Sequence, residues 1–255
     1  MTNNENKINA LVDSTWWKPK PGVSFDWNLN NPNKIDSVIT EIIDVDAFET
    51  SAETVATLHL EGKKVIAYVS VGTIEKSRPD LGLLPSEIVG KVYPEWPDEK
   101  WLNIHEIDKM KPWLISRFEM IKRKGFDAIE PDNLDGYGNV TGFDISLDDT
   151  KLFCNYIIDL AHSLGLGIGQ KNMPELTLIY CSKFDWALTE DAFQQGWQQE
   201  MLPYINKNKP VFAVEYTDKT SQNNFVTQVC PVASSMRYSC ILKNRMLDKW
   251  IYFCH

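Results

Sequence analysis

The chain alternates short runs of β-branched and aromatic residues with longer amphipathic stretches, and this alternation limits its fold more than any other feature. Repeated β/α units of this kind are typical of a parallel sheet covered by helices. Eight such units can close into a (β/α)8 barrel, which takes about 250 residues. The chain has 255 residues. The eight predicted strands cover residues 24–29, 37–44, 65–71, 128–132, 167–171, 186–190, 211–216 and 238–242.

The fold class is therefore predicted to be α/β, with one (β/α)8 TIM barrel spanning residues 1–255. No Pro/Gly/Ser-rich stretch or charge block divides the chain. One helix is expected over residues 147–164, because its apolar residues recur at helical spacing. Ser146 and Asp149 form its capping box, and Gly165 provides the left-handed residue after its end. A second helix is expected from about Pro112, in its first turn, to a stop at Gly125.

The overall charge excludes two classes of partner. The chain carries 26 Lys and Arg against 35 Asp and Glu, a net charge of −9. This sign disfavours general binding to nucleic acids or anionic membranes and favours a cationic partner. No apolar run approaches the ~20 residues of a membrane helix, and the polar start of the chain lacks a signal-peptide pattern. A soluble, monomeric protein is expected, with its localisation left open.

The cysteines and histidines do not indicate a metal site. The five cysteines are scattered and form no C-x-x-C pair, so neither a zinc site nor a disulfide framework is expected. Because five is odd, at least one thiol stays unpaired within a monomer. The four histidines lack the spacing of catalytic metal ligands. No cofactor or metal is therefore expected, and carboxylates remain as the expected source of chemistry.

Two acidic residues in one predicted strand locate a candidate site. Alternate residues of a strand share a face, so Glu130 and Asp132 point to the same side. Buried carboxyl groups are costly unless they lie near water, cations or hydrogen-bond donors. In a barrel, such conditions occur at the C-terminal mouth, where barrel enzymes carry their active sites. The strand over 128–132 is therefore expected to deliver these two acids to a catalytic mouth.

Polar residues also follow other predicted strands at the same end. They are Asp44, Asp46, Lys171, Asn172, Glu190, Asp191 and Glu215. Carboxyl groups that converge raise each other's pKa, and a nearby lysine lowers it, so that one can stay protonated while another is ionised. Glycoside hydrolysis needs such a pair, one acid to protonate the leaving oxygen and one carboxylate to attack or to activate water.

Each candidate also has an alternative structural role. For Asp44, Asp46 and Asp191 the alternative is a role as helix caps or loop-tying residues. Lys171 could simply pair with Glu130. Some aromatic residues could form a sugar-stacking floor, although buried and surface aromatics are common. These are Trp16, Trp17, Trp96, Trp101 and Tyr137.

One continuous segment resembles a known family. Residues 124–137 read KGFDAIEPDNLDGY and continue through Asn139 to Thr141-Gly142-Phe143. This block resembles the G-F-D-G-[VI]-E-P-D-N-x-D-x-Y…N-x-T-G-[FL] pattern of glycoside hydrolase family 114, which contains endo-α-1,4-polygalactosaminidases and spherulin-4-like proteins. Further matching pieces, in the same order, lie at 44–48, 65–72, 96–102, 161–162, 171–172, 189–190, 214–216 and 242–243.

The resemblance implies a barrel that hydrolyses α-1,4-linked galactosamine polymers internally, with Asp132 and Glu190 as the catalytic carboxylates. By analogy with a retaining route, Asp132 is the nucleophile and Glu190 the general acid/base. The substrate-binding residues are expected to be Asp44, Asp46, Tyr68, Glu130, Asn133, Tyr137, Lys171, Asn172, Glu215 and Tyr216. One departure is the sequence Asp191-Ala192-Phe193, where the family often has a cysteine.

An acidic mouth suits the substrate that the resemblance implies. Deacetylated galactosamine units carry ammonium groups, which carboxylates attract. The expected partner is thus a cationic or partly acetylated amino-sugar polymer. Two alternatives remain at this point: a carbohydrate-binding barrel without activity, and a structural, spore-coat-like protein.

Overall fold

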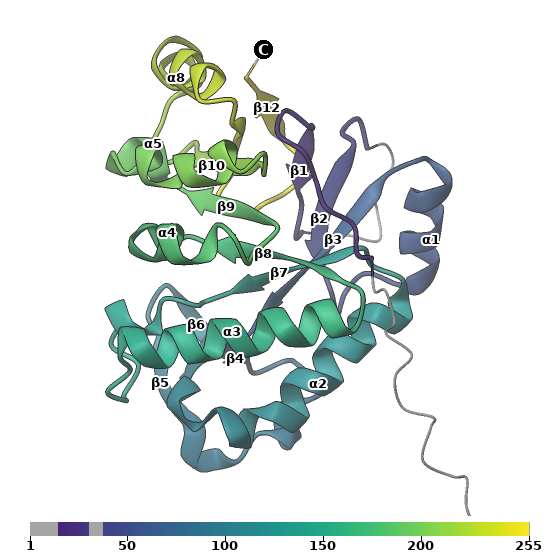
Figure 1. Ribbon diagram of the computed structural model, residues 1–255, viewed down its shortest axis with the longest axis vertical. Helices are drawn as coiled ribbons and strands as arrows, with labels where there is room; N and C mark the ends of the chain where they lie inside the picture. Colours follow the sequence, from purple (N-terminus) through teal and green to yellow (C-terminus); the bar gives the residue numbers. More distant parts are fainter. Residues whose placement is uncertain (1–14, 31–37, 255) are drawn as a thin grey trace, which may run out of the picture.

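The computed structural model describes residues 15–30 and 38–254. Within them a nine-stranded sheet forms the wall of a barrel, and helices lie on its outside (Figure 1). Eight strands are parallel to their neighbours in chain order, which confirms the predicted (β/α)8 fold. They are β1 (Phe25–Trp27), β2 (Ile42–Asp46), β3 (Lys64–Ser70), β7 (Ala128–Asp132), β8 (Gly167–Lys171), β9 (Trp186–Glu190), β10 (Val211–Tyr216) and β11 (Ser239–Lys243).

The predicted bounds of β7, β8, β9 and β10 agree with the structure, whereas those of β2 are wrong. The strand was expected over 37–44, and residue 37 lies outside the described residues. In the structure β2 begins at Ile42, which pairs with Phe25 of β1. The preceding Ile39 is 76% exposed. A β-branched run thus suggested a strand where pairing with neighbours does not begin until Ile42.

Side chains alternate between the inside and the outside of the barrel. On β10, Phe212, Val214 and Tyr216 belong to an apolar cluster that fills the interior, together with Trp186 of β9. The intervening Ala213 packs in the larger cluster between the strands and the helices. This alternation, which follows from strand geometry, decides which polar residues can reach the mouth.

The helices alternate with the strands along the chain, and together with the sheet they enclose the larger apolar cluster. They are α1 (Ala52–Leu60), α2 (Ile107–Lys124), α3 (Leu147–Ser163), α4 (Thr177–Tyr180), α5 (Ala192–Gln195), α6 (Leu202–Asn206), α7 (Gln222–Asn224) and α8 (Cys230–Ser235). Single-turn 3-10 helices are η2 (Leu81–Leu83), η3 (Ser86–Ile88), η4 (Ile104–Glu106), η5 (Gly136–Gly138), η6 (Pro174–Leu176) and η7 (Gln198–Met201), and η8 (Phe225–Val229) is a π-helix. Among the described helices, none is both long and apolar enough to cross a membrane.

Both predicted helices exist. The capping box of Ser146 and Asp149 begins α3, and Gly165 follows it with a φ of +69°. For α2, Gly125 ends the helix in the left-handed conformation as expected. The expected start at Pro112 is wrong, because α2 begins at Ile107 and Pro112 lies inside it. The helix extends toward its N-terminus since Met110 is fully buried in the apolar cluster.

A three-stranded antiparallel sheet between β3 and α2 was not predicted. It has the order β4-β6-β5, with β4 (Thr73–Glu75), β5 (Val89–Tyr93) and β6 (Trp96–Leu102). Gly72 precedes it and approaches the backbone of Asn133 so closely that a Cβ atom would lie 1.7 Å from the Asn133 oxygen. Glycine is therefore required where the chain leaves β3 beside the end of β7.

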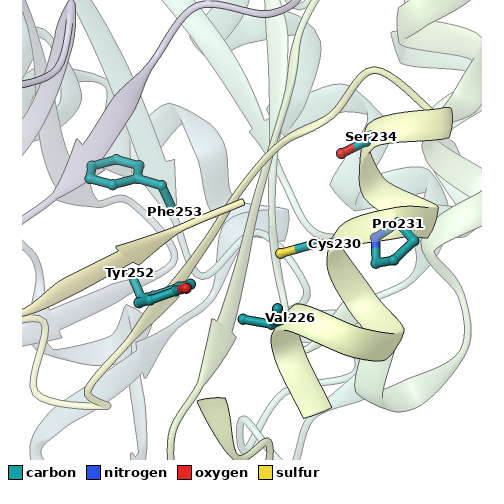
Figure 2. A pocket seen from close by; sticks show the side chains of 6 residues that line it. All are labelled: Val226, Cys230, Pro231, Ser234, Tyr252 and Phe253. Atoms are coloured by element: carbon teal, nitrogen blue, oxygen red, sulfur yellow. The ribbon is translucent and has the colours of Figure 1, made fainter. Parts of the chain in front are cut away.

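The C-terminal segment lies beside β1, where the two ends of the sheet approach each other. Strand β12 (Ile251–Phe253) runs antiparallel to β11, and Lys243 of β11 binds Asp26 of β1 at 2.7 Å. A disulfide joins Cys230 of α8 to Cys254, which the scattered cysteines did not indicate. Beside it lies a hollow of about 170 Å³, lined by Val226, Cys230, Pro231, Ser234, Tyr252 and Phe253 (Figure 2). Cys154, Cys181 and Cys240 are free and buried.

Candidate active site

A cleft of about 1710 Å³ opens over the C-terminal ends of the barrel strands. Eight of the residues expected at the site line this cleft. They are Tyr68, Asp132, Asn133, Tyr137, Lys171, Asn172, Glu190 and Tyr216. They come from β3, from β7 and β8 with the loops that follow them, from β9 and from β10, so segments far apart in the sequence meet here. The position at the strand ends agrees with the expected mouth of a barrel enzyme.

Lys171 is the centre of the site. Its ammonium group lies 2.8 Å from Glu130 Oε1, 2.9 Å from Asp132 Oδ1 and 3.2 Å from Glu190 Oε2. The side chain is only 3% exposed, and the Nζ atom lies 4.4 Å from the centre of the Trp27 ring. The three carboxylates raise the pKa of Lys171 well above its usual value against the opposing effect of burial. Lys171 of β8 thus holds three acids from two other strands, β7 and β9, around one positive charge.

Two tyrosines orient the outer pair of carboxylates. The Tyr68 hydroxyl donates to Asp132 Oδ2 at 2.8 Å, and the Tyr216 hydroxyl donates to Glu190 Oε1. Burial, followed by the neighbouring carboxylate, raises the pKa of each tyrosine well above its usual value, so both remain donors at neutral pH. Each carboxylate is therefore held at one oxygen by Lys171 and at the other by a tyrosine.

Two asparagines at strand ends support this arrangement through the left-handed conformation. Asn172 has a φ of +48°, and its side-chain oxygen accepts a hydrogen bond from the Glu190 backbone N–H at 2.9 Å. Asn133 has a φ of +62° and donates to Ser70 and Thr73 at the start of the inserted sheet. Asparagine tolerates this conformation better than most residues. The two residues fix the backbone at the exits of β8 and β7 beside the acids.

Glu130 and Asp44 lie below the cleft rather than in its lining. Each is 1% exposed, and both point into the barrel. Burial raises the pKa of Glu130 to about 7, partly offset by Lys171. Burial and the nearby Glu130 raise the pKa of Asp44 well above its usual value. These two acids were expected to bind substrate, but the structure places them beneath the surface that a substrate can reach.

Asp46 and Glu215 do not reach the cleft either. Asp46 accepts hydrogen bonds from Arg78, with the shorter at 2.6 Å, and from the backbone N–H groups that follow β2. Glu215 is fully buried on the outer face of β10, where it accepts from the backbone N–H groups of Phe193 and Gln194. Burial raises the pKa of Glu215 to about 7. Both are structural in this fold. Because successive residues of a strand point to opposite faces, Glu215 and the inward-facing Tyr216 cannot share the cleft.

Only two of the five aromatic residues proposed for a sugar-stacking floor lie in the cleft. Trp96 on β6 is 44% exposed, and Tyr137 donates a hydrogen bond to Glu175. Trp101 is 1% exposed and packs beneath Tyr93. Trp16 and Trp17 lie outside the cleft, since Trp16 stacks on His162 at the end of α3 and Trp17 packs near Trp186.

Other residues of the cleft were not predicted from the sequence. Trp27, Tyr93 and Trp197 provide aromatic lining. Arg245 stacks over the Tyr216 ring at 3.7 Å and binds Asp191 and Asp218, each at 2.9 Å. Trp27 could have been found, because it lies within the first predicted strand, over 24–29, and in the structure it ends β1 on the inward face. Arg245 follows β11 in a loop, and nothing in its local sequence pattern indicates a site.

The charge of the cleft is strongly negative. Its described lining contains the acids Glu49, Glu95, Glu99, Asp132, Asp135, Glu175, Glu190, Asp191 and Asp218, and the bases Lys171, Lys219 and Arg245. Burial raises the pKa of Glu99 to about 7. Among the described residues, no group of His, Cys, Asp and Glu side chains is arranged to hold a metal ion. Such a surface attracts cationic ligands at neutral pH.

A family model and one solved structure at 31% identity show the family of the chain. The sequence model of glycoside-hydrolase family GH114 matches residues 7–255. The crystal structure of Aspergillus fumigatus Ega3 in complex with galactosamine has 31% sequence identity and a TM-score of 0.86, over 94% of this chain and 98% of that chain. The glycoside hydrolase domain of PelA from Pseudomonas aeruginosa shares the fold at 13% identity, with a TM-score of 0.67 over 92% of this chain and 99% of that domain. No curated protein sequence matches the chain.

Proposed function

The chain belongs to glycoside hydrolase family GH114 and is a glycosidase, and from this premise we propose that it cleaves the internal linkages of α-1,4-linked galactosamine polymers through Asp132 and Glu190. The observation that carries the proposal is the pair of carboxylates held by one ammonium group at the base of an acidic cleft. Asp132 and Glu190 each contact Lys171, and each accepts a hydrogen bond from a tyrosine. A carboxylate pair beside a sugar linkage is what glycoside hydrolysis requires.

The chemistry of the cleft supports an amino-sugar substrate. Ega3, which shares 31% of its sequence with this chain, was crystallised with galactosamine. The excess of carboxyl groups in the cleft lining favours units that carry a free ammonium group over neutral, acetylated units. Exposed Trp96 and partly exposed Tyr137 offer faces on which sugar rings can stack. An elongated polymer with mostly free amino groups is the substrate that fits best.

The spacing of the two carboxylates supports a retaining mechanism. Asp132 Oδ1 and Glu190 Oε2 lie 2.9 and 3.2 Å from the same nitrogen atom. These two oxygens therefore cannot be farther apart than the two distances combined, which is less than the roughly 6.5–9.5 Å of inverting enzymes. A separation below the inverting range favours direct attack of one carboxylate on the sugar over activation of a water molecule.

In the proposed first step, an oxygen of Asp132 attacks the anomeric carbon while Glu190 gives its proton to the leaving oxygen. The glycosidic bond breaks, and the sugar becomes an ester of Asp132. In the second step, Glu190 takes a proton from water, whose oxygen attacks the same carbon and releases Asp132. The Tyr68 and Tyr216 hydroxyls donate hydrogen bonds to Asp132 and Glu190, so each can stabilise the negative charge when it lies on its own partner.

The test is the release of new reducing ends from four polymers: polygalactosamine, polyglucosamine and their N-acetylated forms. We expect the greatest release from polygalactosamine and little from either acetylated polymer. Asp132→Asn serves as the inactive control on the same scaffold. If wild type releases no reducing ends from any polymer but binds polygalactosamine, the protein is a carbohydrate-binding barrel and the catalytic proposal is wrong.

A further inference from the structure

Asp44 and Glu130 occupy one layer inside the barrel, directly below the candidate site. Side chains in a layer of such a barrel come from alternate strands, and β3 lies between β2 and β7. The neighbours of Asp44 in register are Trp27 and Ile66, which carry no charge. The two carboxyl groups face each other within hydrogen-bonding reach, and each residue is 1% exposed.

The hydrogen bonds of this pair are incomplete if both acids are ionised. Glu130 Oε1 accepts from Lys171 at 2.8 Å. Among the described residues, no N–H or O–H group donates to Glu130 Oε2 or to either oxygen of Asp44. A buried acceptor without a donor is destabilising, and two facing carboxylates also repel each other. One proton placed between the two groups removes the repulsion and supplies a donor.

We propose that Asp44 is a positioning residue, protonated at neutral pH, that donates a hydrogen bond to Glu130 and so keeps Lys171 directed at Asp132 and Glu190. The effect of Asp44 on catalysis rests on the proposed function. With Oε2 held from below, Glu130 presents Oε1 to Lys171 as a singly charged partner. Without the donated proton, Glu130 turns or takes a proton itself, and the ammonium group loses its lower contact.

The charges of the cluster support this arrangement through the reaction cycle. The Asp44–Glu130 pair carries one negative charge and Lys171 carries one positive charge. In the proposed mechanism, Asp132 starts as the attacking carboxylate and Glu190 carries the proton; in the ester intermediate, Asp132 is neutral and Glu190 has given its proton to the leaving group. The charge above Lys171 is thus the same in both states, and the pair below it need not exchange protons.

The other charged groups near Asp44 act in opposite directions. Lys171 of β8 lowers the pKa of Asp44, whereas Glu130 and Asp132 of β7 raise it, and burial is the largest effect. The strands on either side contribute the uncharged Trp27 and Ile66. Position 44 therefore combines an apolar surrounding with two acids and one shared base, which favours the protonated form.

The test compares Asp44→Leu with Asp44→Asn on polygalactosamine. Leucine removes the donor, and we expect kcat to fall by about 100-fold, as for a small displacement of catalytic groups, with KM nearly unchanged. Asparagine keeps an N–H donor toward Glu130, so it is expected to restore kcat to within about fivefold of wild type. The thermal midpoint of Asp44→Leu should equal or exceed that of wild type, because a buried acid is removed.

A matched control uses a buried acid at the opposite end of the barrel. Asp185 is 3% exposed and accepts from Trp16 and from the backbone N–H of Ile168 at 3.1 Å. Asp185→Asn should lower the thermal midpoint and leave kcat unchanged. The opposite pattern at Asp44, lower kcat without lower stability, is what a purely structural residue would not produce.

Infrared spectroscopy tests the proton without any substrate. At pH 7, the wild-type spectrum minus that of Asp44→Asn should contain the carbonyl stretch of one buried protonated carboxyl group, because bands from other protonated acids are common to both proteins. The proposal is overturned if this band is absent, if Asp44→Leu keeps the kcat of wild type, or if Asp44→Asn is as impaired as Asp44→Leu. If wild type cleaves no polymer, the proposed function fails, and the infrared result still decides the protonation of Asp44.

Discussion

Two buried ionic clusters lie close together at the C-terminal ends of the strands. The Arg78 cluster consists of Arg78 and Arg117 with Asp46, Glu75 and Asp80. The Lys171 cluster consists of Lys171 with Asp44, Glu130, Asp132 and Glu190. In the first, two guanidinium groups meet three carboxylates. In the second, one ammonium group meets four carboxyl groups.

The balance of charges differs between the clusters, and it indicates a structural role for the Arg78 cluster and a chemical role for the Lys171 cluster. Arg78 holds Asp46 at 2.6 Å and Glu75 at 2.8 Å, which joins β2 to β4 of the inserted sheet. Arg117 of α2 holds Asp80 at 2.7 Å and donates to the backbone oxygen of Ser70 at the end of β3. Paired in this way, these charges fix the sheet that carries Trp96. The Lys171 cluster keeps an excess of acid beside a cleft, where protons and cationic sugars can be exchanged.

The largest expected effect comes from the outer acids of the Lys171 cluster. Asp132→Asn and Glu190→Gln should each lower kcat by at least about 1000-fold, because the nucleophile or the proton donor is lost. Circular dichroism and thermal midpoints should stay near wild type. Retention of more than about a tenth of wild-type kcat by either variant would assign the chemistry to other residues.

The Arg78 cluster should respond in stability instead. Arg78→Met leaves buried Asp46 without this partner and Glu75 with only the 3.7 Å contact to Arg117, so the free energy of unfolding should fall by about 3–5 kcal/mol. The measurement is chemical denaturation, with kcat recorded on the folded protein. Arg123→Met is the control, since its pair with Glu119 at 3.7 Å is exposed and worth less than about 1 kcal/mol. Equal effects of the two variants would contradict the structural role of the Arg78 cluster.

The inner acids of the Lys171 cluster should give a pH-dependent stability. Burial raises the pKa of Glu130 from 4.5 to about 7, so between these values the unfolded chain releases a proton that the folded chain keeps. The contribution of Glu130 to the free energy of unfolding is fully present below pH 4.5. It is lost as pH rises to 7, which lowers that free energy by up to about 3 kcal/mol. Glutamine does not titrate, so Glu130→Gln does not lose this contribution, and its thermal midpoint should rise relative to wild type over this pH interval. A difference that is constant with pH would argue against the raised pKa.

The smallest effect is expected at the sheet that the Arg78 cluster supports. Trp96 is 44% exposed in the cleft, and Trp96→Ala should raise KM by about tenfold, with little change in kcat, through lost stacking on a sugar ring. Steady-state kinetics on polygalactosamine provides the measurement. Val92→Ala on β5, also exposed but absent from the cleft lining, should leave KM unchanged. A fall in kcat alone would place Trp96 in positioning rather than in binding.

Strand parity explains both the successes and the errors of the predicted site. Glu130, Asp132, Lys171 and Glu190 were expected together, and the structure brings them within reach of one another. Glu215 was expected with them because it lies near the end of a strand, yet it points outward, one residue before inward-facing Tyr216. Applying alternation to every strand would have removed it.

Other features could not be predicted from local pattern. The inserted sheet contains polar, Pro-containing segments that pair through a hairpin with register shifts. Asp46 looks like a residue of the mouth, but Arg78 lies 32 positions away in the sequence and occupies its carboxylate. The disulfide joins two cysteines of five, and only the fold brings Cys230 next to Cys254.

The sequence by itself determined the barrel and the acids on its inward faces, because side-chain alternation and apolar periodicity are local properties of the chain. Tertiary structure alone decided which acids face water, which are paired with arginine and which share a proton below the cleft. Those outcomes depend on burial and on charges contributed by other strands, and electrostatic energies in a protein interior are set by distances between residues that no local pattern specifies.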